Sequence, residues 1–321
     1  MADRYLVTGG SGFIGSHIVK RLVDTGAFVR VVDNLSTGRS ERLENFRAAI
    51  EFVQGDLVDE QISDSVVKDI DYVLHQAAVP SVQRSIEDPL GTNRANVTAT
   101  LNLLESCRKQ GVRRLVYAGS SSAYGDTEVL PKVEKMVPKP RSPYALQKLV
   151  GEYYCKLYGE LYGLETVSLR YFNVFGPDQD PHSEYSAVIP KFVSRLLAGQ
   201  SITVYGDGEQ SRDFTYIDNV VQANLLALRA REASGKVCNV GCGQRLSLNR
   251  LIQILESILN VQAKVVRVAP KPGDVRHSMA DIGLARAVLG YEPKVDAAEG
   301  LRLTVEAFAR SEGDSRSTDR T

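Results

Sequence analysis

Tyr144 and Lys148 are the two side chains of this sequence best suited to proton transfer. In the segment Tyr-Ala-Leu-Gln-Lys the phenol and the ammonium are four residues apart, so a helix would present both on one face. A tyrosine needs a lowered pKa to act as a base near neutral pH, and a nearby ammonium favours the phenolate. The pair predicts a general base, although the same spacing also occurs by chance on surface helices.

A run of hydroxyl side chains lies about two dozen residues before this pair. Residues 119–125, Gly-Ser-Ser-Ser-Ala-Tyr-Gly, follow an apolar strand pattern at 114–118. Ser120 would stand at the end of that strand, where its hydroxyl could assist the Tyr144 phenol. A solvated loop is the alternative interpretation of the serine run.

Three glycines near the N-terminus predict a nucleotide-binding turn. The segment Val-Thr-Gly-Gly-Ser-Gly-Phe-Ile-Gly places Gly9, Gly12 and Gly15 between an apolar strand pattern and a helical pattern. Such a turn directs backbone N–H groups and a helix N-terminus at a pyrophosphate. A second strand pattern at 28–32 ends at Asp33, whose carboxylate could accept both ribose hydroxyls of an adenosine and would repel a 2′-phosphate. The combination predicts NAD rather than NADP.

Alternating strand and helix patterns would position these groups. Apolar strand patterns lie at 50–53, 72–75, 114–118 and 166–169, and helical patterns at 94–109 and 144–162. Strands separated by helices predict an α/β fold with a Rossmann-type, doubly wound parallel sheet. Ligands of such sheets bind at the carboxyl ends of the strands, where each of the motifs above falls.

The alternation ends after about residue 175, where prolines mark a loop-rich stretch before a helical pattern at 187–198. We expect a smaller α/β substrate-binding lobe there. The predicted division is a Rossmann domain of residues 1–175 plus about 216–241, and a substrate lobe of about 176–215 and 242–310. Residues 311–321 are polar without periodicity and predict a disordered tail.

Composition excludes several classes of partner. Of the 321 residues 43% are hydrophobic and 24% charged, which is ordinary for a globular protein, and the formal net charge is zero. A neutral chain without a basic stripe argues against binding nucleic acid or an anionic membrane. No apolar run approaches the roughly 18 residues that span a bilayer. The first strand pattern leaves no room for a signal peptide, so we expect a cytoplasmic location.

The cysteines and histidines show no metal-binding pattern. Neither the four cysteines nor the four histidines have the paired spacing of a zinc site, so we expect no metal and reduced structural thiols. The cysteines are Cys107, Cys155, Cys238 and Cys242.

Taken together, the motifs resemble those of the extended short-chain dehydrogenases/reductases. The matching segments are the glycine turn, the Ser120 run, Tyr144 with Lys148, Arg170-Tyr171-Phe172-Asn173 and Arg212-Asp213-Phe214. Within that superfamily the chain is similar to the nucleotide-sugar 4-epimerases, specifically the UDP-N-acetylglucosamine type, over about residues 3–305. The segments that carry this closer likeness are 33–38, 75–82, 171–176 and 273–278.

The resemblance implies NAD as cofactor, held by the first domain. The residues implied are Gly9, Gly12, Phe13, Ile14, Gly15, Asp33, Asn34, Ser36, Thr37, Gly38, Asp56, Leu57, Gln76, Ala77, Ala78, Asn96, Tyr144, Lys148 and Tyr171.

It also implies a UDP-sugar substrate between the two lobes. Asn173 would bind the diphosphate–sugar region, and Arg212 and Arg276 would meet phosphate or ribose; a surface ion pair of Arg212 with Asp213 is the alternative. Where the family usually carries Arg, this chain has Lys271, which puts the phosphate role there in doubt. The uracil would pack on Ala187, Val188 and Tyr205, and the other substrate-binding positions are Pro80, Ser81, Ser122, Gln179, Asp274 and Ser278.

The catalytic residues implied are Ser120, Tyr144 and Lys148. Tyr144 would take the proton of the sugar 4-hydroxyl while hydride passes from C4 to NAD, and hydride would return to the opposite face of a 4-keto sugar. The small Ser278 favours UDP-N-acetylglucosamine and UDP-N-acetylgalactosamine as the substrate pair, unless that serine lies away from the sugar. The alternatives are a UDP-glucose/UDP-galactose 4-epimerase, a UDP-glucuronate epimerase or decarboxylase, and a non-catalytic NAD-binding regulator.

A homodimer through helices 94–109 and 144–162 is also implied, because related proteins pair these helices in a four-helix bundle. The second helix has apolar residues on more than one face, including Leu149, Tyr153, Leu157 and Leu161. Burial of both faces within one chain is the alternative.

Overall fold

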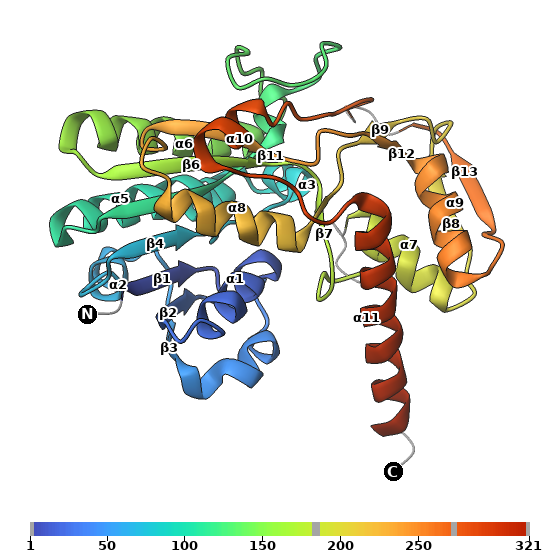
Figure 1. Cartoon of the computed structure of the whole chain (residues 1–321), viewed down its shortest axis with the longest axis horizontal. Helices are drawn as coiled ribbons and strands as arrows, with labels where there is room; N and C mark the ends of the chain where they lie inside the picture. The colour runs from blue at the N-terminus through green and yellow to red at the C-terminus, as the bar shows by residue number, and fades with distance from the viewer. Residues whose placement is uncertain (1–2, 182–186, 271–274, 319–321) are drawn as a thin grey trace.

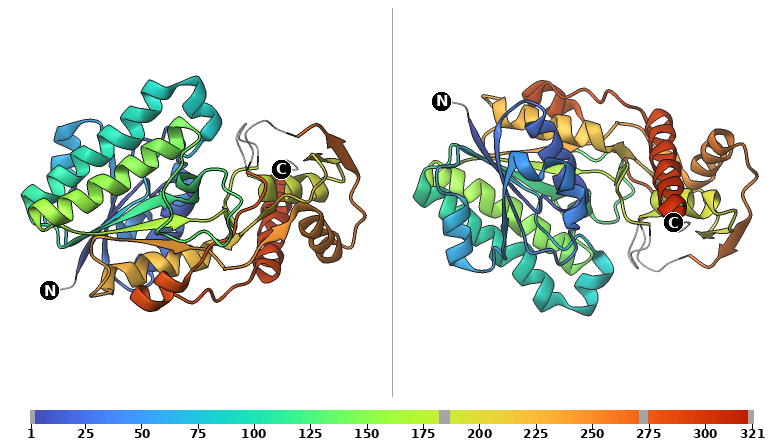
Figure 2. Two further views of the ribbon diagram at one scale, coloured as in Figure 1. Left: turned by 90° about the horizontal axis from the view of Figure 1, so that it is seen from above. Right: turned by 90° about the horizontal axis from the view of Figure 1, so that it is seen from below.

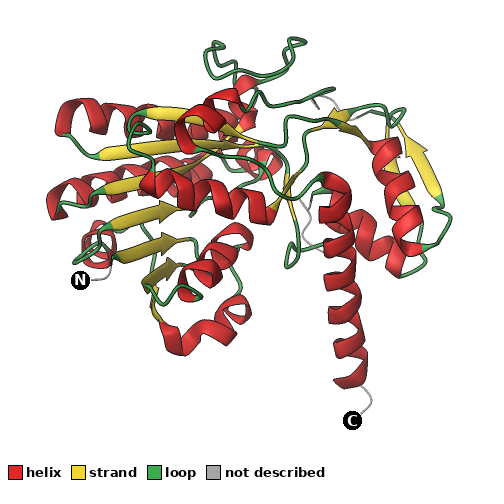
Figure 3. Ribbon diagram, viewed as in Figure 1, coloured by secondary structure: helices red, strands yellow, loops and turns green. Residues whose placement is uncertain are grey.

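The structure, a computed structural model, describes residues 3–181, 187–270 and 275–318, with side chains up to residue 310. Seven strands form a large sheet (Figure 1 and Figure 3). In spatial order they are β11 (Lys236–Val240), β6 (Glu165–Tyr171), β5 (Arg114–Ser120), β4 (Tyr72–His75), β1 (Arg4–Thr8), β2 (Phe28–Asp33) and β3 (Ile50–Gln54). Every neighbouring pair is parallel, which confirms the predicted doubly wound sheet. The strand order reverses between β1 and β4, where open α/β sheets bind their ligands.

Helices cover both faces of this sheet (Figure 2). On one face α1 (Phe13–Val23) packs against α8 (Ile217–Arg229), and on the other α5 (Ala99–Gln110) packs against α2 (Glu60–Val66) and α6 (Pro143–Tyr162). Successive side chains of a strand point to opposite faces. Leu6 therefore joins the core beneath α5 and its neighbour Val7 joins the core beneath α1, and both are fully buried.

Short helical segments connect the strands on the ligand side. The predicted helix at 94–109 begins as a π-helical turn, η2 (Arg94–Thr98), before α5 continues it. The other short segments are η1 (Ser40–Ala49), α3 (Val82–Glu87), α4 (Pro89–Asn93) and η3 (Ser121–Tyr124).

A smaller lobe lies beyond the carboxyl ends of the large sheet (Figure 1). It contains three helices that contact one another, α7 (Val188–Leu197), α9 (Leu248–Leu259) and α11 (Ala297–Thr318). Its two-stranded sheets are β8 (Ile202–Tyr205) with β13 (Val265–Val268), and β9 (Ser211–Arg212) with β12 (Leu246–Ser247). A third short pair, β7 (Val174–Phe175) with β10 (Thr215–Tyr216), lies where the chain passes between the lobes.

Two expectations about the C-terminal part are corrected. Helix α10 (Gly283–Leu289) packs on β11 and α8, so this piece of 242–310 lies against the large sheet rather than in the small lobe. Residues 311–318 are not a disordered tail, because α11 extends to Thr318. Leu301 and Val305 anchor that helix by burial, and each further residue then adds a hydrogen bond without a new nucleation cost. Within the described residues, we find no helix of the length and apolarity needed to cross a membrane.

Candidate active site

A cavity of about 1040 Å³ opens at the carboxyl ends of the large sheet and is lined by residues of both lobes. Eighteen of the nineteen residues expected to hold NAD line it, from Gly9 to Tyr171. The exception is Asn96, which was expected to bind NAD but does not line the cavity.

The glycine turn brings backbone close to the base of this cavity. Gly9 has φ +64°, and a Cβ there would lie 2.7 Å from the backbone of Ala77. A Cβ on Gly15 would lie 2.2 Å from the Gly9 carbonyl oxygen, so both positions require glycine. Helix α1 begins after Gly12, which has no side chain to cap it. Its first N–H groups can therefore take the pyrophosphate of a dinucleotide.

Asp33 is held in place as a ribose acceptor. Its Oδ2 accepts the Ser11 N–H at 2.9 Å and its Oδ1 accepts the Leu35 N–H at 2.9 Å. Burial raises the pKa of Asp33, while these two bonds oppose that rise. Each oxygen keeps a lone pair for a ribose hydroxyl, whereas a 2′-phosphate would meet a fixed carboxylate. The turn and this carboxylate thus fit NAD.

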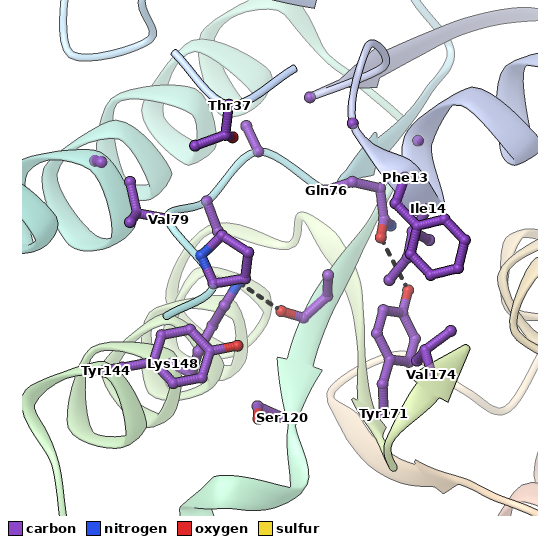
Figure 4. A pocket seen from close by; sticks show the side chains of 18 of the residues that line it. Phe13, Ile14, Thr37, Gln76, Val79, Ser120, Tyr144, Lys148, Tyr171 and Val174 are labelled. Carbon is purple, nitrogen blue, oxygen red and sulfur yellow. Dashed lines mark hydrogen bonds between the residues drawn. The ribbon is translucent and has the colours of Figure 1, made fainter. Parts of the chain in front are cut away.

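Ser120, Tyr144 and Lys148 converge on the cavity from β5 and α6 (Figure 4). Burial raises the pKa of the Tyr144 phenol, and the neighbouring Ser120 hydroxyl opposes that rise. The Lys148 ammonium is buried and donates to the Ala118 carbonyl oxygen at 2.9 Å. Burial lowers the pKa of Lys148 to about 8. A phenol, a hydroxyl and an ammonium placed in this way can exchange one proton with a bound hydroxyl group.

Asn96 lies behind the cavity wall and does not line it. Its carboxamide accepts the Val79 N–H at 2.7 Å and donates to Gln147 at 2.8 Å. The η2 turn points this side chain inward, where it fixes the loop after β4 instead of facing a ligand.

The Tyr171 hydroxyl belongs to a buried network at the cavity edge. It contacts Gln76 at 3.2 Å and Asn224 at 2.8 Å, and the Tyr171–Gln76 bond is drawn in Figure 4. This network joins β6 and α8 to the loop after β4, so it fixes the part of the cavity wall against which a flat ring of a ligand could pack.

Seven of the expected substrate-binding residues line the same cavity, namely Pro80, Ser122, Asn173, Gln179, Ala187, Arg212 and Ser278. Asn173 donates to the Asp213 carbonyl oxygen at 3.2 Å and to the Ser278 hydroxyl at 3.4 Å. A second cavity of about 260 Å³ shares Asn173, Ala187 and Arg212 with the first, and Val188 lies in its wall. Its remaining wall is mostly apolar, so a flat ring would fit there.

Three expected substrate residues lie elsewhere. Ser81 caps α3 by accepting the Arg84 N–H. Tyr205 is 39% exposed at the end of β8 and lines neither cavity, because β8 pairs there with β13 at the outer side of the lobe. Arg276 pairs with Asp207 at 2.8 Å in solvent. Asp274 and Lys271 lie outside the described residues.

The alternative surface pair of Arg212 with Asp213 is wrong. Asp213 is fully buried, and its carboxylate accepts N–H groups of Cys242, Gly243 and Ala280. This carboxylate joins three segments of the chain, and burial raises its pKa to about 6. Arg212 instead lines both cavities.

Sequence reasoning missed several cavity residues. Lys132, which is 1% exposed, lines the cavity, and no motif marks it. Arg39 and Arg42 follow the Asp33 segment directly, a signal that could have been used. Arg39 pairs with Asp180 at 2.5 Å and Arg42 donates to the Asp178 carbonyl oxygen at 2.7 Å. These contacts link the loop after β2 to the loop after β7 beside the cavity.

No group of three or more His, Cys, Asp or Glu within the described ranges is arranged to hold a metal ion.

The family description "NAD dependent epimerase/dehydratase family" matches residues 5–241. A putative UDP-glucose 4-epimerase of Methanocaldococcus jannaschii is 40% identical over 94% of this chain and 96% of that protein. The UDP-glucose 4-epimerase of Thermotoga maritima, solved with UDP-glucose, has a TM-score of 0.92 and 39% identity, covering 96% of this chain and 99% of that one. The UDP-N-acetylglucosamine 4-epimerase of Methanobrevibacter ruminantium, in complex with UDP-N-acetylmuramic acid, has a TM-score of 0.91 and 41% identity, covering 97% and 100%.

Proposed function

This chain belongs to the NAD-dependent epimerase/dehydratase family, and from that premise we propose that it interconverts the C4 epimers of a UDP-hexose. The observation that carries the proposal is one cavity that joins a dinucleotide turn, a fixed ribose acceptor and the group of Ser120, Tyr144 and Lys148. That cavity continues into a smaller apolar one, so dinucleotide and nucleotide sugar have separate places.

NAD would be held by the α1 N-terminus and Asp33, and when bound it supplies a reversible acceptor for the hydride of C4. The chain's own residues handle the proton. Tyr144 as phenolate takes the proton of the sugar 4-hydroxyl and later returns it to the 4-keto oxygen. Ser120 donates to the same oxygen, and the Lys148 charge stabilises the phenolate. No net oxidation results, because the hydride removed from one face of C4 returns to the other.

For the 4-keto sugar to rotate within the site, UDP must be anchored by contacts that do not involve the sugar. Arg212 lies between the two cavities, where its guanidinium can pair with a diphosphate. The apolar second cavity suits the uracil. The mechanism requires looser contacts at the sugar, so that a 4-keto sugar can present its opposite face while UDP stays bound.

Within this class we propose UDP-N-acetylglucosamine and UDP-N-acetylgalactosamine as the preferred pair. Ser278 lines the cavity, where its hydroxyl accepts from the Asn173 side chain at 3.4 Å, and the small residues Ala187 and Ser122 line the same cavity. These modest volumes leave room for an acetamido group. UDP-glucose and UDP-galactose form the alternative pair, which the same cavity also admits.

The test is to incubate purified protein with each UDP-sugar and to follow the epimer by NMR or chromatography. Conversion of UDP-N-acetylglucosamine with a higher kcat/KM than UDP-glucose is expected. Conversion of UDP-glucose alone would support the alternative pair, and conversion of UDP-glucuronate alone would support the acidic-sugar enzymes. No conversion of any UDP-sugar in protein that retains NAD would support a binding role without catalysis.

We further propose that the chain acts as a homodimer through α6. Tyr153, Leu157 and Leu161 are 52%, 44% and 66% exposed, and their spacing of four residues aligns them along one face. Leu149, expected on that surface, is instead buried within the chain. The exposed stripe remains without a cover in the described part of the chain, and a second copy would bury it in a helix bundle.

A further inference from the structure

A buried ion pair lies directly behind the proposed active site. Glu152 on α6 and Arg170 on β6 are 2% and 4% exposed. Arg170 Nε donates to both carboxylate oxygens of Glu152 at 3.0 and 3.1 Å, and Nη2 donates to one of them at 2.7 Å. Neither residue lines the cavity. Removing two charges from water is costly, so such a pair needs a reason beyond stability.

The Glu152 carboxylate lies beside β5, the strand whose Ala118 carbonyl oxygen accepts the Lys148 ammonium. Lys148 and Glu152 are four residues apart on α6, so they share a face of the helix. Lys148 donates to the carbonyl oxygen of Ala118, and a Cβ on the next residue, Gly119, would lie 2.9 Å from Glu152 Oε1. The carboxylate therefore approaches β5 one residue beyond the anchor of the ammonium and one residue before Ser120.

Lys148 has no carboxylate within ion-pair distance in the part of the chain that the structure describes, although it is buried. Burial favours the neutral amine, and the charge of Glu152 opposes that effect on the Lys148 pKa. The other groups around the pair do not carry a compensating negative charge near neutral pH. Burial raises the pKa values of Tyr117 on β5, Tyr124 on η3 and the Cys155 thiol on α6.

Two further charged or titratable neighbours complete the surroundings. His75 on β4 is neutral, because burial and then the Lys148 charge lower its pKa to about 3. Glu134 faces the Arg170 side of the pair, where its Oε1 accepts the Asn239 N–H at 2.8 Å. Glu152 is thus the carboxylate whose charge reaches Lys148.

We propose that Glu152, held by Arg170, is a positioning residue that keeps the Lys148 ammonium charged and directed at the Ala118 carbonyl. This inference rests on the proposed role of Tyr144 as the base. Arg170 has two tasks in this arrangement. Its fork fixes the carboxylate geometry. Burial raises the pKa of Glu152, and the hydrogen bonds and charge of Arg170 oppose that rise. Its guanidinium also lies 4.6 Å from the centre of the Tyr124 ring, which holds it from the other side.

The test measures the titration of Lys148 itself in NAD-loaded protein. Lysine labelled with ¹³C at Cε gives a resonance for Lys148, assigned by its absence in Lys148→Arg. Glu152→Gln keeps the shape of the side chain and removes its charge, so the Lys148 pKa should fall by about one unit. Glu152→Asp keeps the charge and is the matched control, so its titration should stay closer to that of the natural protein.

Activity gives an independent second readout. In Glu152→Gln the alkaline limb of the kcat–pH profile should move to lower pH by the same amount as the Lys148 pKa, with KM for the UDP-sugar unchanged. A variant that only loosened the fold would lower kcat at every pH. If Glu152→Gln does not fold because Arg170 is left unpaired, Glu152→Gln/Arg170→Gln removes both charges together. The Lys148 pKa should then still fall, but by less, because the positive charge of Arg170 no longer opposes the ammonium.

An unshifted Lys148 titration in a folded variant that lacks the Glu152 charge would overturn the inference. Equal shifts in Glu152→Asp and Glu152→Gln would also overturn it. The Lys148 titration needs no turnover. Absence of UDP-sugar conversion by the natural protein would therefore reject the proposed function without deciding this inference, and an unshifted titration in an active enzyme would reject this inference alone.

Discussion

At the scale of single residues, the site depends on groups that burial would otherwise neutralise. Burial raises the pKa of the Tyr144 phenol and lowers that of the Lys148 ammonium, so both effects favour the uncharged forms. The Ser120 hydroxyl opposes the first effect and Glu152 opposes the second. The chemistry proposed here needs a phenolate next to an ammonium, so the opposing effects of Ser120 and Glu152 decide whether it operates near neutral pH.

Tyr144→Phe should remove the base and keep the ring. General acid–base groups typically contribute about 10²–10⁴-fold, so we expect kcat to fall at least that far while NAD remains bound. Steady-state rates and the absorbance of retained NAD would measure both. Tyr153→Phe, on the same helix but exposed, is the control and should behave as the natural protein. Undiminished turnover by Tyr144→Phe would remove Tyr144 from the mechanism.

Ser278→Tyr should fill the space that an acetamido group needs. Overpacking a tight site costs about 1–3 kcal/mol, or roughly one to two decades in rate. We expect that loss in kcat/KM for UDP-N-acetylglucosamine and a much smaller loss for UDP-glucose. Ser278→Ala controls for the hydroxyl contact with Asn173 and should leave the ratio of the two substrates near its natural value. Equal losses on both substrates would show that Ser278 is not the gate.

At the scale of elements, buried polar side chains tie strands and helices together beneath the site. His75 at the end of β4 contacts the Thr8 hydroxyl of β1 at 2.7 Å and the Thr100 hydroxyl of α5 at 2.9 Å. Asn96 connects η2 to the loop after β4 in the same way. These bonds set how far the strand ends stand from α5 and α6, so they hold the cavity at its observed width.

Acid should destabilise the protein through His75. Burial lowers its pKa from 6.5 to about 3, so the unfolded chain binds this proton first as the pH falls. The contribution of His75 to the free energy of unfolding is complete above about pH 6.5 and is lost toward pH 3, by at most about 1.4 kcal/mol per pH unit. Denaturant unfolding from pH 7 to pH 4 would measure this slope.

His75→Gln should flatten that slope, whatever it does to stability at pH 7. The matched control is His277→Gln, because His277 is near the surface and should keep most of the slope. A His75→Gln variant with the natural pH dependence would contradict the assignment.

At the scale of the whole molecule, the cavity exists because two lobes meet over the ends of the sheet. Their connection includes Arg39 with Asp180 and Arg42 with the Asp178 carbonyl oxygen, which join segments far apart in sequence. The first lobe supplies Asp33 and Tyr144, and the second supplies Ala187 and Ser278. Neither lobe alone encloses a dinucleotide together with a nucleotide sugar.

The α6 stripe predicts a dimer that one charge should break. Leu157→Glu places a carboxylate in the centre of the exposed face, where a partner helix would bury it. Light scattering should give twice the chain mass for the natural protein and the single mass for Leu157→Glu. Val137→Glu changes another apolar residue, 78% exposed but far from this stripe in sequence, and should leave the dimer intact. A natural protein that stays monomeric would contradict the proposal.

Local sequence patterns were sufficient to predict the sheet and the residues that end its strands. The glycine turn, Asp33 and the spacing of Tyr144 and Lys148 depend on local backbone geometry, which short segments specify. Ser120 follows from the same logic, since a parallel sheet gathers its strand ends at one edge.

Which distant side chains support the cavity, and which lie away from it, became clear from the packing of the folded chain. Glu152 and Arg170 are 18 residues apart and meet because α6 packs on β6. Arg276 and Tyr205 were expected from the family resemblance to bind the substrate, but both are exposed to solvent, because the packing of the small lobe sets the direction of their side chains. Long-range contacts of this kind depend on how separate elements pack, and no local spacing encodes that packing.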